Sequence, residues 1–240
     1  MSAGPALRVR RAVGVTRGVV LVLHGGKAES RAPARPWHLS AVRMRFFARA
    51  VHRAERRHGI AVWSLRYRWR GWNGAEASPV ADARWALDRI RAEHGAVPVV
   101  LIGHSMGGRT ALRVVDDAGV CAVLGLAPWL PDGEPRLPLG PRPLLVMHGT
   151  ADRWTDPVAS RAYVVAAAAE GTPARWVPIP DVGHFLLRER RLWRRLALDF
   201  VAGLPCLHGQ AEAAAAPNPE QQADPGDPHS DDRCTGRSRP

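Results

Sequence analysis

Cysteine is scarce in this sequence, and long apolar runs are missing from it. The 240 residues include three cysteines, Cys121, Cys206 and Cys234, at unrelated spacings. Such a set indicates neither a disulfide framework nor a zinc site, so a reducing compartment is the expectation. No stretch approaches the roughly 20 consecutive apolar residues of a membrane-spanning helix, and the first residues lack the apolar segment of a secretory signal. We therefore expect a cytoplasmic protein without a membrane partner.

Lysine is almost absent, although the chain is strongly basic. The formal net charge is +12, and 33 of the 34 basic residues are arginines, Lys27 being the exception. A basic balance can indicate nucleic-acid binding. Here the arginines are scattered along the chain, which is typical of a solvated surface and of a GC-rich coding sequence. We expect no dedicated nucleic-acid partner.

Large apolar side chains almost disappear after residue 204. Residues 205–240 are rich in Pro, Ala, Asp and Gln. Such a segment cannot bury enough apolar surface to offset its ordering entropy. The sequence therefore predicts one folded domain over residues 1–204 and a disordered C-terminal tail over residues 205–240.

The first 204 residues alternate between two patterns. Short, nearly continuous apolar runs predict strands that are covered on both faces. These strands span residues 18–26, 59–67, 97–105, 119–128, 142–150 and 174–180, after a single N-terminal strand around residues 6–15. In the segments between these strands, apolar residues recur at the spacing of a helix. Residues 41–57, for example, predict a helix with Val42, Phe46, Ala50 and Ala54 on one face. The alternation predicts an α/β fold, a three-layer sandwich with a mostly parallel, doubly wound sheet.

One serine lies between glycines where a predicted strand ends and a predicted helix begins. The stretch "GHSMGG" places Ser105 between Gly103 and Gly107. A tight strand-to-helix turn needs flanking residues without bulk, and G-x-S-x-G is the pattern of a nucleophile elbow. Ligands of parallel sheets bind beyond the carboxyl ends of the strands, where Ser105 is expected to lie. A serine hydroxyl is a weak nucleophile, so this interpretation needs a base and a group that orients the base.

Two later stretches supply candidates for both groups. Asp152 follows a predicted strand in "HGTAD", and His184 lies in "VGH" after the last predicted strand. The order Ser, Asp, His is that of α/β-hydrolases. Over residues 18–203 the sequence strongly resembles the α/β-hydrolase family, through "HGG", "GHSMGG", "HGTAD" and "GH" in the correct order.

The resemblance implies a role for each of these three residues. Ser105 would be the nucleophile, His184 the general base and later the general acid, and Asp152 the carboxylate that holds the imidazole tautomer. It also implies an acyl-enzyme intermediate. No cofactor and no metal are expected.

Negative charge that develops on the substrate carbonyl oxygen needs preorganised donors. In the family, one donor is the backbone N–H after the nucleophile, which is that of Met106 here. The second comes from the loop after the first core strand, where Gly26 is the preferred residue and Lys27 the alternative.

Other polar residues near these motifs have simpler interpretations. Asp156 competes with the chosen acid, but it precedes Pro157 and fits a helix N-cap. The side chain of His104 should point away from the serine hydroxyl and serve packing. His24 and His148 end strands and are expected to bond loop backbone.

Clues to the substrate come from two loops. About 15 loop-like residues separate the strand after the elbow from the strand that carries the acid. This leaves no room for a cap domain and predicts an open pocket, as in small dienelactone-hydrolase-like or serine-aminopeptidase-like members. Trp72 or Trp129 could line an acyl pocket. The arginines Arg66, Arg68 and Arg70 either brace the floor of the site or favour an acidic substrate.

The sequence therefore predicts a serine hydrolase, an esterase-type enzyme for small or medium ester, thioester or amide substrates. Its expected partner is a small-molecule acyl substrate. The alternative is a catalytically silent hydrolase-fold protein that binds a ligand or a partner. Fold similarity alone does not choose between bond types.

Overall fold

The structure is a computed structural model, and it describes residues 4–209. Its strands are β1 (Ala6–Arg10), β2 (Gly18–Leu23), β3 (Ile60–Arg66), β4 (Val99–His104), β5 (Val120–Leu126), β6 (Leu144–Gly149) and β7 (Ala174–Ile179). Its α-helices are α1 (Leu39–Glu55), α2 (Ser78–His94), α3 (Met106–Leu112), α4 (Pro157–Ala169) and α5 (Arg190–Ala202), with short 3-10 turns η1 (Arg56–His58) and η2 (Gly74–Glu76). None of the helices within residues 4–209 is both long and apolar enough to cross a membrane.

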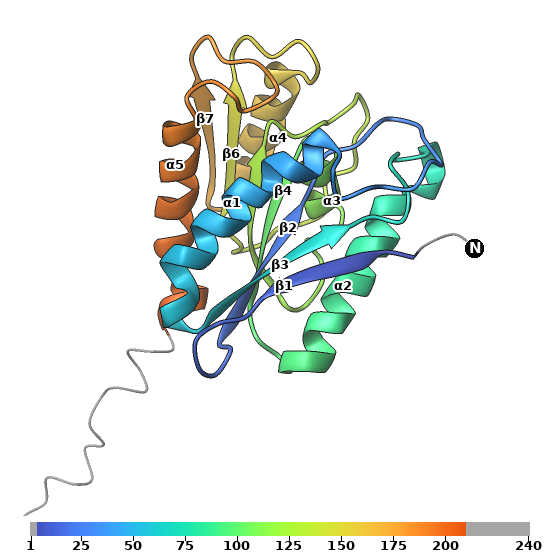
Figure 1. Ribbon diagram of the computed structural model, residues 1–240. Helices are drawn as coiled ribbons and strands as arrows, with labels where there is room; N and C mark the ends of the chain where they lie inside the picture. Colours follow the sequence, from blue (N-terminus) through green and yellow to red (C-terminus); the bar gives the residue numbers. More distant parts are fainter. Residues whose placement is uncertain (1–3, 210–240) are drawn as a thin grey trace, which may run out of the picture.

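The seven strands form one sheet in the order β1-β3-β2-β4-β5-β6-β7. β1 is antiparallel to β3, and the other neighbouring strands are parallel. Helices α1 and α5 cover one face of the sheet, and α2, α3 and α4 cover the other (Figure 1). This is the predicted three-layer fold, with the single N-terminal strand that the sequence indicated. No helix interrupts residues 127–143 between β5 and β6, so a cap domain is absent from this connection.

Buried strands supply the centre of both apolar layers. All six residues of β2 are buried, as a strand with helices on both faces requires. Their side chains alternate between the two layers, because successive residues of a strand point to opposite faces. Leu21 and Leu23 pack on the α2 and α3 side, whereas Val20 and Val22 pack on the α1 and α5 side.

The buried face of α1 differs from the predicted one. Its buried apolar residues are Met44, Phe47, Ala48 and Val51. Phe46, predicted to be buried, is 61% exposed. A straight helix buries positions i, i+3, i+4 and i+7, whereas residues spaced by four each time move gradually around the helix axis. The predicted face used a constant spacing of four residues, and it was therefore wrong for Phe46.

The folded chain continues beyond the predicted boundary at residue 204. Leu207 is buried against the layer of α1 and α5, and Cys206 forms a disulfide with Cys121 of β5. The expectation of unpaired cysteines was therefore wrong for this pair, which lies 85 residues apart in sequence. Such a pairing cannot be deduced from spacing, and it removes the cysteine argument for a reducing compartment. The remainder of the predicted tail, residues 210–240 with Cys234, lies outside the described residues.

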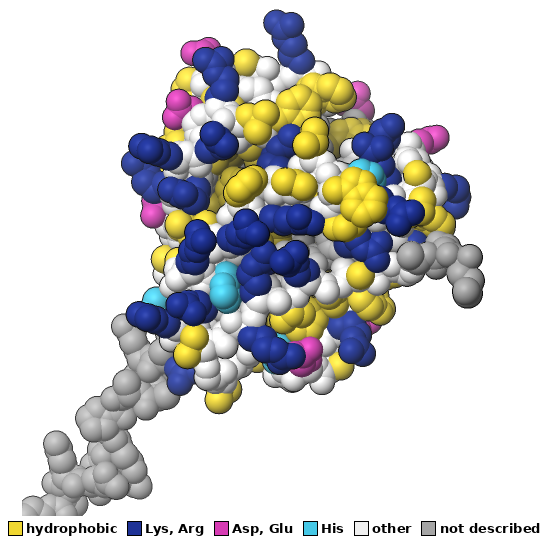
Figure 2. All heavy atoms as spheres, viewed as in Figure 1, with side chains coloured by type: hydrophobic (Ala, Val, Ile, Leu, Met, Phe, Trp, Pro, Cys, Tyr) yellow, Lys and Arg dark blue, Asp and Glu magenta, His cyan; other side chains and the backbone are white. Residues whose placement is uncertain are grey.

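Basic side chains dominate the face that α1 covers, and acidic side chains are few there (Figure 2). Helix α1 has no acidic residue in its first turn, and its one acidic residue, Glu55, is buried at its last position. The arginines of α1 are Arg43, Arg45, Arg49 and Arg53. The helix therefore places positive charge along one side of the sheet.

Candidate active site

Ser105 occupies the sharp turn between β4 and α3. Its backbone has φ 55° and ψ −121°, a left-handed conformation that costs a residue with a side chain of order 1–3 kcal/mol. The turn is possible because its glycines let backbone segments touch. A Cβ atom on Gly103 would collide with the backbone of Gly107, and one on Gly107 would collide with the backbone of Leu23. The G-x-S-x-G spacing is thus explained by backbone packing around the partly buried Ser105.

A cavity of about 470 Å³ lies beyond the carboxyl ends of the strands. Ser105, His184, Gly26, Met106 and Trp129 are among the residues that line it. These side chains and backbone groups come from segments up to 158 residues apart, because the loops after β2, β4, β5 and β7 meet at one edge of the sheet. The fold therefore brings most of the predicted site residues into one cavity.

Asp152 and His184 form a hydrogen-bonded pair beside this cavity. His184 Nδ1 lies 2.8 Å from Asp152 Oδ2, and both residues are buried. The N–H groups of Trp154 and Thr155 donate to the other carboxylate oxygen at 2.8 and 3.0 Å. Burial alone would raise the pKa of Asp152, but hydrogen bonds from His148, His184 and the two N–H groups hold it well below its usual range. The carboxylate is thus kept ionised where it can orient the imidazole.

The Ser105 hydroxyl makes no hydrogen bond with the other described residues. Contacts between a nucleophile and its base are often loose before substrate binds. His184 is the histidine whose Nδ1 faces Asp152 and whose ring lines the same cavity as Ser105.

Thr155 is a polar residue of the site that the sequence interpretation missed. Its hydroxyl lies 2.9 Å from Asp152 Oδ2, 3.1 Å from His184 Nδ1 and 3.2 Å from His148 Nε2. Because Thr155 follows Asp152 by three residues in one tight loop, its hydroxyl can donate a hydrogen bond to the carboxylate. The sequence signal is a short polar side chain three residues after the acid, and it is weak because such residues are common in loops.

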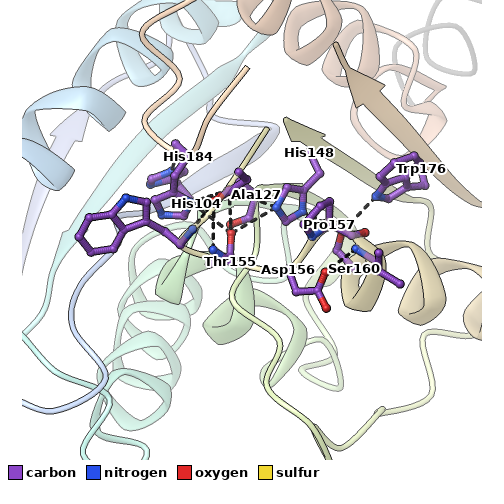
Figure 3. A network of polar contacts seen from close by, with 12 residues as sticks. His104, Ala127, His148, Thr155, Asp156, Pro157, Ser160, Trp176 and His184 are labelled. Atoms are coloured by element: carbon purple, nitrogen blue, oxygen red, sulfur yellow. Dashed lines mark hydrogen bonds and ion pairs between the residues drawn. The ribbon is translucent and has the colours of Figure 1, made fainter. Parts of the chain in front are cut away.

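His148 makes contacts that the sequence interpretation placed elsewhere. Its Nε2 lies 3.2 Å from Asp152 Oδ2, and its Nδ1 lies 2.7 Å from the hydroxyl of Ser160. Trp176 Nε1 donates to the same hydroxyl at 3.0 Å, which extends the chain of polar contacts from Asp152 to β7 (Figure 3). The expectation that His148 bonds loop backbone was therefore wrong. His148 and His184 thus contact the same carboxylate oxygen of Asp152.

The other two histidines near the motifs are buried and serve packing. The ring of His104 lies 4.8 Å from that of His184, and its Nε2 is 3.0 Å from the His184 carbonyl oxygen. His24 Nδ1 lies 2.7 Å from the carbonyl oxygen of Gly25, the backbone contact that was expected. Burial lowers the pKa of His104 to about 3 and that of His24 to about 4.

These two histidines predict a loss of stability in acid. Between the folded values and the ordinary value of 6.5, the unfolded chain binds protons that the folded protein does not. The free energy of unfolding is therefore highest above about pH 6.5 and falls below it, by about 1.4 kcal/mol per pH unit for each histidine. Urea denaturation at a series of pH values measures this slope, and His104→Gln should reduce its histidine contribution by about half. An unchanged slope in that variant would contradict the assignment.

The two candidate oxyanion donors lie close together. A Cβ on Gly26 would collide with the side chain of Met106 and with the carbonyl oxygen of Arg70. The N–H of Lys27 donates to that carbonyl oxygen at 2.9 Å, so it is engaged. Among the described residues, neither the Gly26 nor the Met106 N–H donates a backbone hydrogen bond in the loops. The geometry favours Gly26 over Lys27.

Asp156 occupies the position expected for a cap. Its carboxylate accepts the N–H of Val158 at 2.7 Å, and α4 begins at Pro157. The carboxylate that bonds His184 is that of Asp152, four residues earlier.

The two candidate substrate-binding tryptophans have different surroundings. Trp129 lines the cavity, whereas Trp72 is 3% exposed and is not among the cavity-lining residues. The guanidinium of Arg109 lies 3.8 Å from the ring centroid of Trp72 and 4.6 Å from that of Trp129. It also pairs with Glu134 at 2.6 Å. Trp72 therefore packs behind the wall of the site, and Trp129 is the candidate of the two that lines the cavity.

One group of potential metal ligands occurs within residues 4–209, away from this cavity. Ligand atoms of Glu55, His58 and His208 lie within 4.8 Å of one another, at the end of α1 and the C-terminal end of the described chain. The residues lining the cavity around Ser105 include no such cluster.

The sequence and the fold together define a protein class. Residues 19–139, half of the chain, match the alpha/beta hydrolase family. The chain belongs to the α/β-hydrolase family. No curated protein sequence matches this chain.

Solved structures share the fold at low sequence identity. An alpha-beta serine hydrolase homologue from Coxiella burnetii is 16% identical, with a TM-score of 0.60, and the match covers 82% of this chain and 91% of that one. A serine hydrolase without a lid from Xanthomonas campestris is 20% identical, with a TM-score of 0.59 over 82% and 88% of the two chains. An esterase from Thermogutta terrifontis is 18% identical, with a TM-score of 0.62 over 84% and 88%. These likenesses show the fold.

Proposed function

We propose that this protein is a serine hydrolase of the esterase type, acting on small or medium acyl substrates. The observation that carries the proposal is the buried Asp152–His184 pair, whose imidazole shares one cavity with Ser105. The strained backbone of Ser105 also supports it, because such strain is retained at functional sites. Within residues 4–209 the cavity is walled by loops, and no cap domain lies between β5 and β6, so the cavity suits substrates of modest size that enter from solvent.

In the proposed reaction, His184 takes the proton of the Ser105 hydroxyl while Oγ forms a bond to the carbonyl carbon. The N–H groups of Gly26 and Met106 stabilise the negative oxygen of the tetrahedral intermediate. The intermediate collapses to an acyl-enzyme when His184 gives its proton to the leaving alcohol. Water then attacks the acyl group by the same sequence, which releases the acid and restores Ser105. Asp152 stays ionised throughout and stabilises the imidazolium that forms.

Covalent labelling tests the proposal directly. A fluorophosphonate probe should label the wild-type protein, because it reacts with serine hydroxyls that a base activates. Ser105→Ala should not be labelled, and Ser160→Ala should be labelled because Ser160 is buried beneath the acid rather than exposed in the cavity. Absence of labelling in the wild type, or equal labelling in Ser105→Ala, would contradict the proposal.

A panel of small esters separates this function from the ligand-binding alternative. An enzyme should hydrolyse at least one ester with a rate that depends on Ser105. A silent binding protein should instead show thermal stabilisation by a ligand without turnover.

A further inference from the structure

Cationic side chains gather on one side of the cavity around Ser105. Arg43 of α1 and Lys27 of the loop after β2 line this cavity. A second cavity of about 400 Å³ adjoins it, because Gly26, Arg43 and Phe185 line both. Arg70 lines the second cavity. The two cavities therefore share a wall whose charged groups are positive.

Neither cavity has an acidic lining residue. Within residues 4–209, Arg43, Lys27 and Arg70 also form no ion pair with a carboxylate. Some arginines elsewhere in these residues do pair with carboxylates, for example in Arg31–Glu76, Arg84–Asp116, Arg91–Asp117 and Arg109–Glu134. The positive groups around the two cavities therefore have no carboxylate of the described residues within ion-pairing distance.

Arg43 is the most constrained of these cations. In a chain with 33 arginines, proximity to a site means little, so burial decides the argument. Arg43 is half-buried, and its Nε is inaccessible to solvent without a hydrogen-bond partner. Its guanidinium lies 5.0 Å from the ring centroid of Phe185, the residue after His184. Burial lowers the pKa of Arg43, which reflects the cost of keeping an unpaired charge there.

We propose that the substrate carries a carboxylate, which Arg43 binds beside the reacting ester with Lys27 and Arg70 close by. This inference rests on the proposed function. A carboxylate suits an arginine because the planar guanidinium can donate two parallel hydrogen bonds to it. The ring of Phe185 holds the guanidinium from one side and leaves its N–H groups for the ligand. The substrate class is therefore a carboxylate-bearing ester, such as a half-ester of a dicarboxylic acid.

The test compares matched esters with and without the charge. One pair is the mono-p-nitrophenyl ester of glutaric acid and its methyl p-nitrophenyl diester. A second pair is the acetate ester of p-hydroxybenzoic acid and that of its methyl ester, which places the carboxylate on the leaving group. The wild type should prefer the charged member of at least one pair by about tenfold or more in kcat/KM, once background hydrolysis is subtracted. The responding pair identifies the side of the ester that carries the carboxylate.

Arg43→Gln should reduce this preference by about tenfold. The preference is a ratio measured on one protein sample, so partial loss of folded protein cancels from it. Arg53→Gln is the matched control, because this substitution removes the same charge from an exposed residue near the other end of α1. Arg53→Gln should keep the wild-type ratio.

Each outcome bears on a separate statement. Hydrolysis of both members at similar rates overturns the carboxylate inference and leaves the serine hydrolase proposal intact. Equal loss of preference in Arg43→Gln and Arg53→Gln also overturns it, because the effect would then come from overall charge. A wild type that hydrolyses neither member and escapes fluorophosphonate labelling overturns the proposed function itself.

Discussion

His184→Ala is expected to lower kcat by about a millionfold on any ester that the wild type hydrolyses. The imidazole is the group that must accept the proton of Ser105 and return it to the leaving alcohol. His184 Nδ1 is fixed by Asp152 at 2.8 Å, so water in the place of the ring cannot reproduce its orientation. Steady-state kinetics measures the loss, and circular dichroism verifies that the variant remains folded.

The double variant Ser105→Ala/His184→Ala tests whether these residues act as one unit. Once either residue is absent, the other has no role in the covalent route. The double variant should therefore be about as active as each single variant, and its remaining rate comes from binding and from the oxyanion donors. If the fold-losses in kcat of the two single variants multiplied in the double variant, Ser105 and His184 would act independently, which would contradict the proposed mechanism.

Asp152→Asn is expected to lower kcat by about ten-thousandfold with little change in the fold. An amide keeps the shape of the carboxylate, but its NH₂ group cannot accept the hydrogen bond that His184 Nδ1–H donates. The imidazole then adopts the wrong tautomer and cannot take a proton from Ser105. His148 and Thr155 lose the same charged acceptor, so a modest fall in the melting temperature should accompany the loss of activity.

Asp156→Asn is the matched control for this prediction. Asp156 lies four residues later and caps α4, and asparagine is an equally good N-cap. Its kcat should stay close to that of the wild type. If Asp156→Asn removed activity and Asp152→Asn did not, the assignment of the acid would be reversed.

The order of strands and helices was predictable because it depends on local patterns. Apolar runs gave the seven strands, and the missing cap followed from the short connection between β5 and β6. The glycines around Ser105 predicted the turn because few other residues fit where backbones touch. The buried face of a helix was harder to predict, because the side of α1 that is buried depends on the elements packed against it. Phe46 is exposed and Phe47 buried, although the two are chemically identical.

The contacts around the site could not be read from spacing. The disulfide between Cys121 and Cys206 and the contacts of His148 with Asp152 and Ser160 depend on how distant segments pack. Thr155 is no more distinctive in sequence than other loop threonines.

The sequence by itself determined the α/β architecture, the elbow at Ser105 and the identity of the acid and base candidates. These follow from local rules, namely side-chain periodicity, backbone freedom at glycine and the order of polar residues after strands. Tertiary structure decided which polar groups surround Asp152, that the chain stays packed beyond residue 204 and which cations lack partners among the described residues. Those features depend on three-dimensional proximity and on exclusion of water, and a linear sequence specifies neither until the chain has packed.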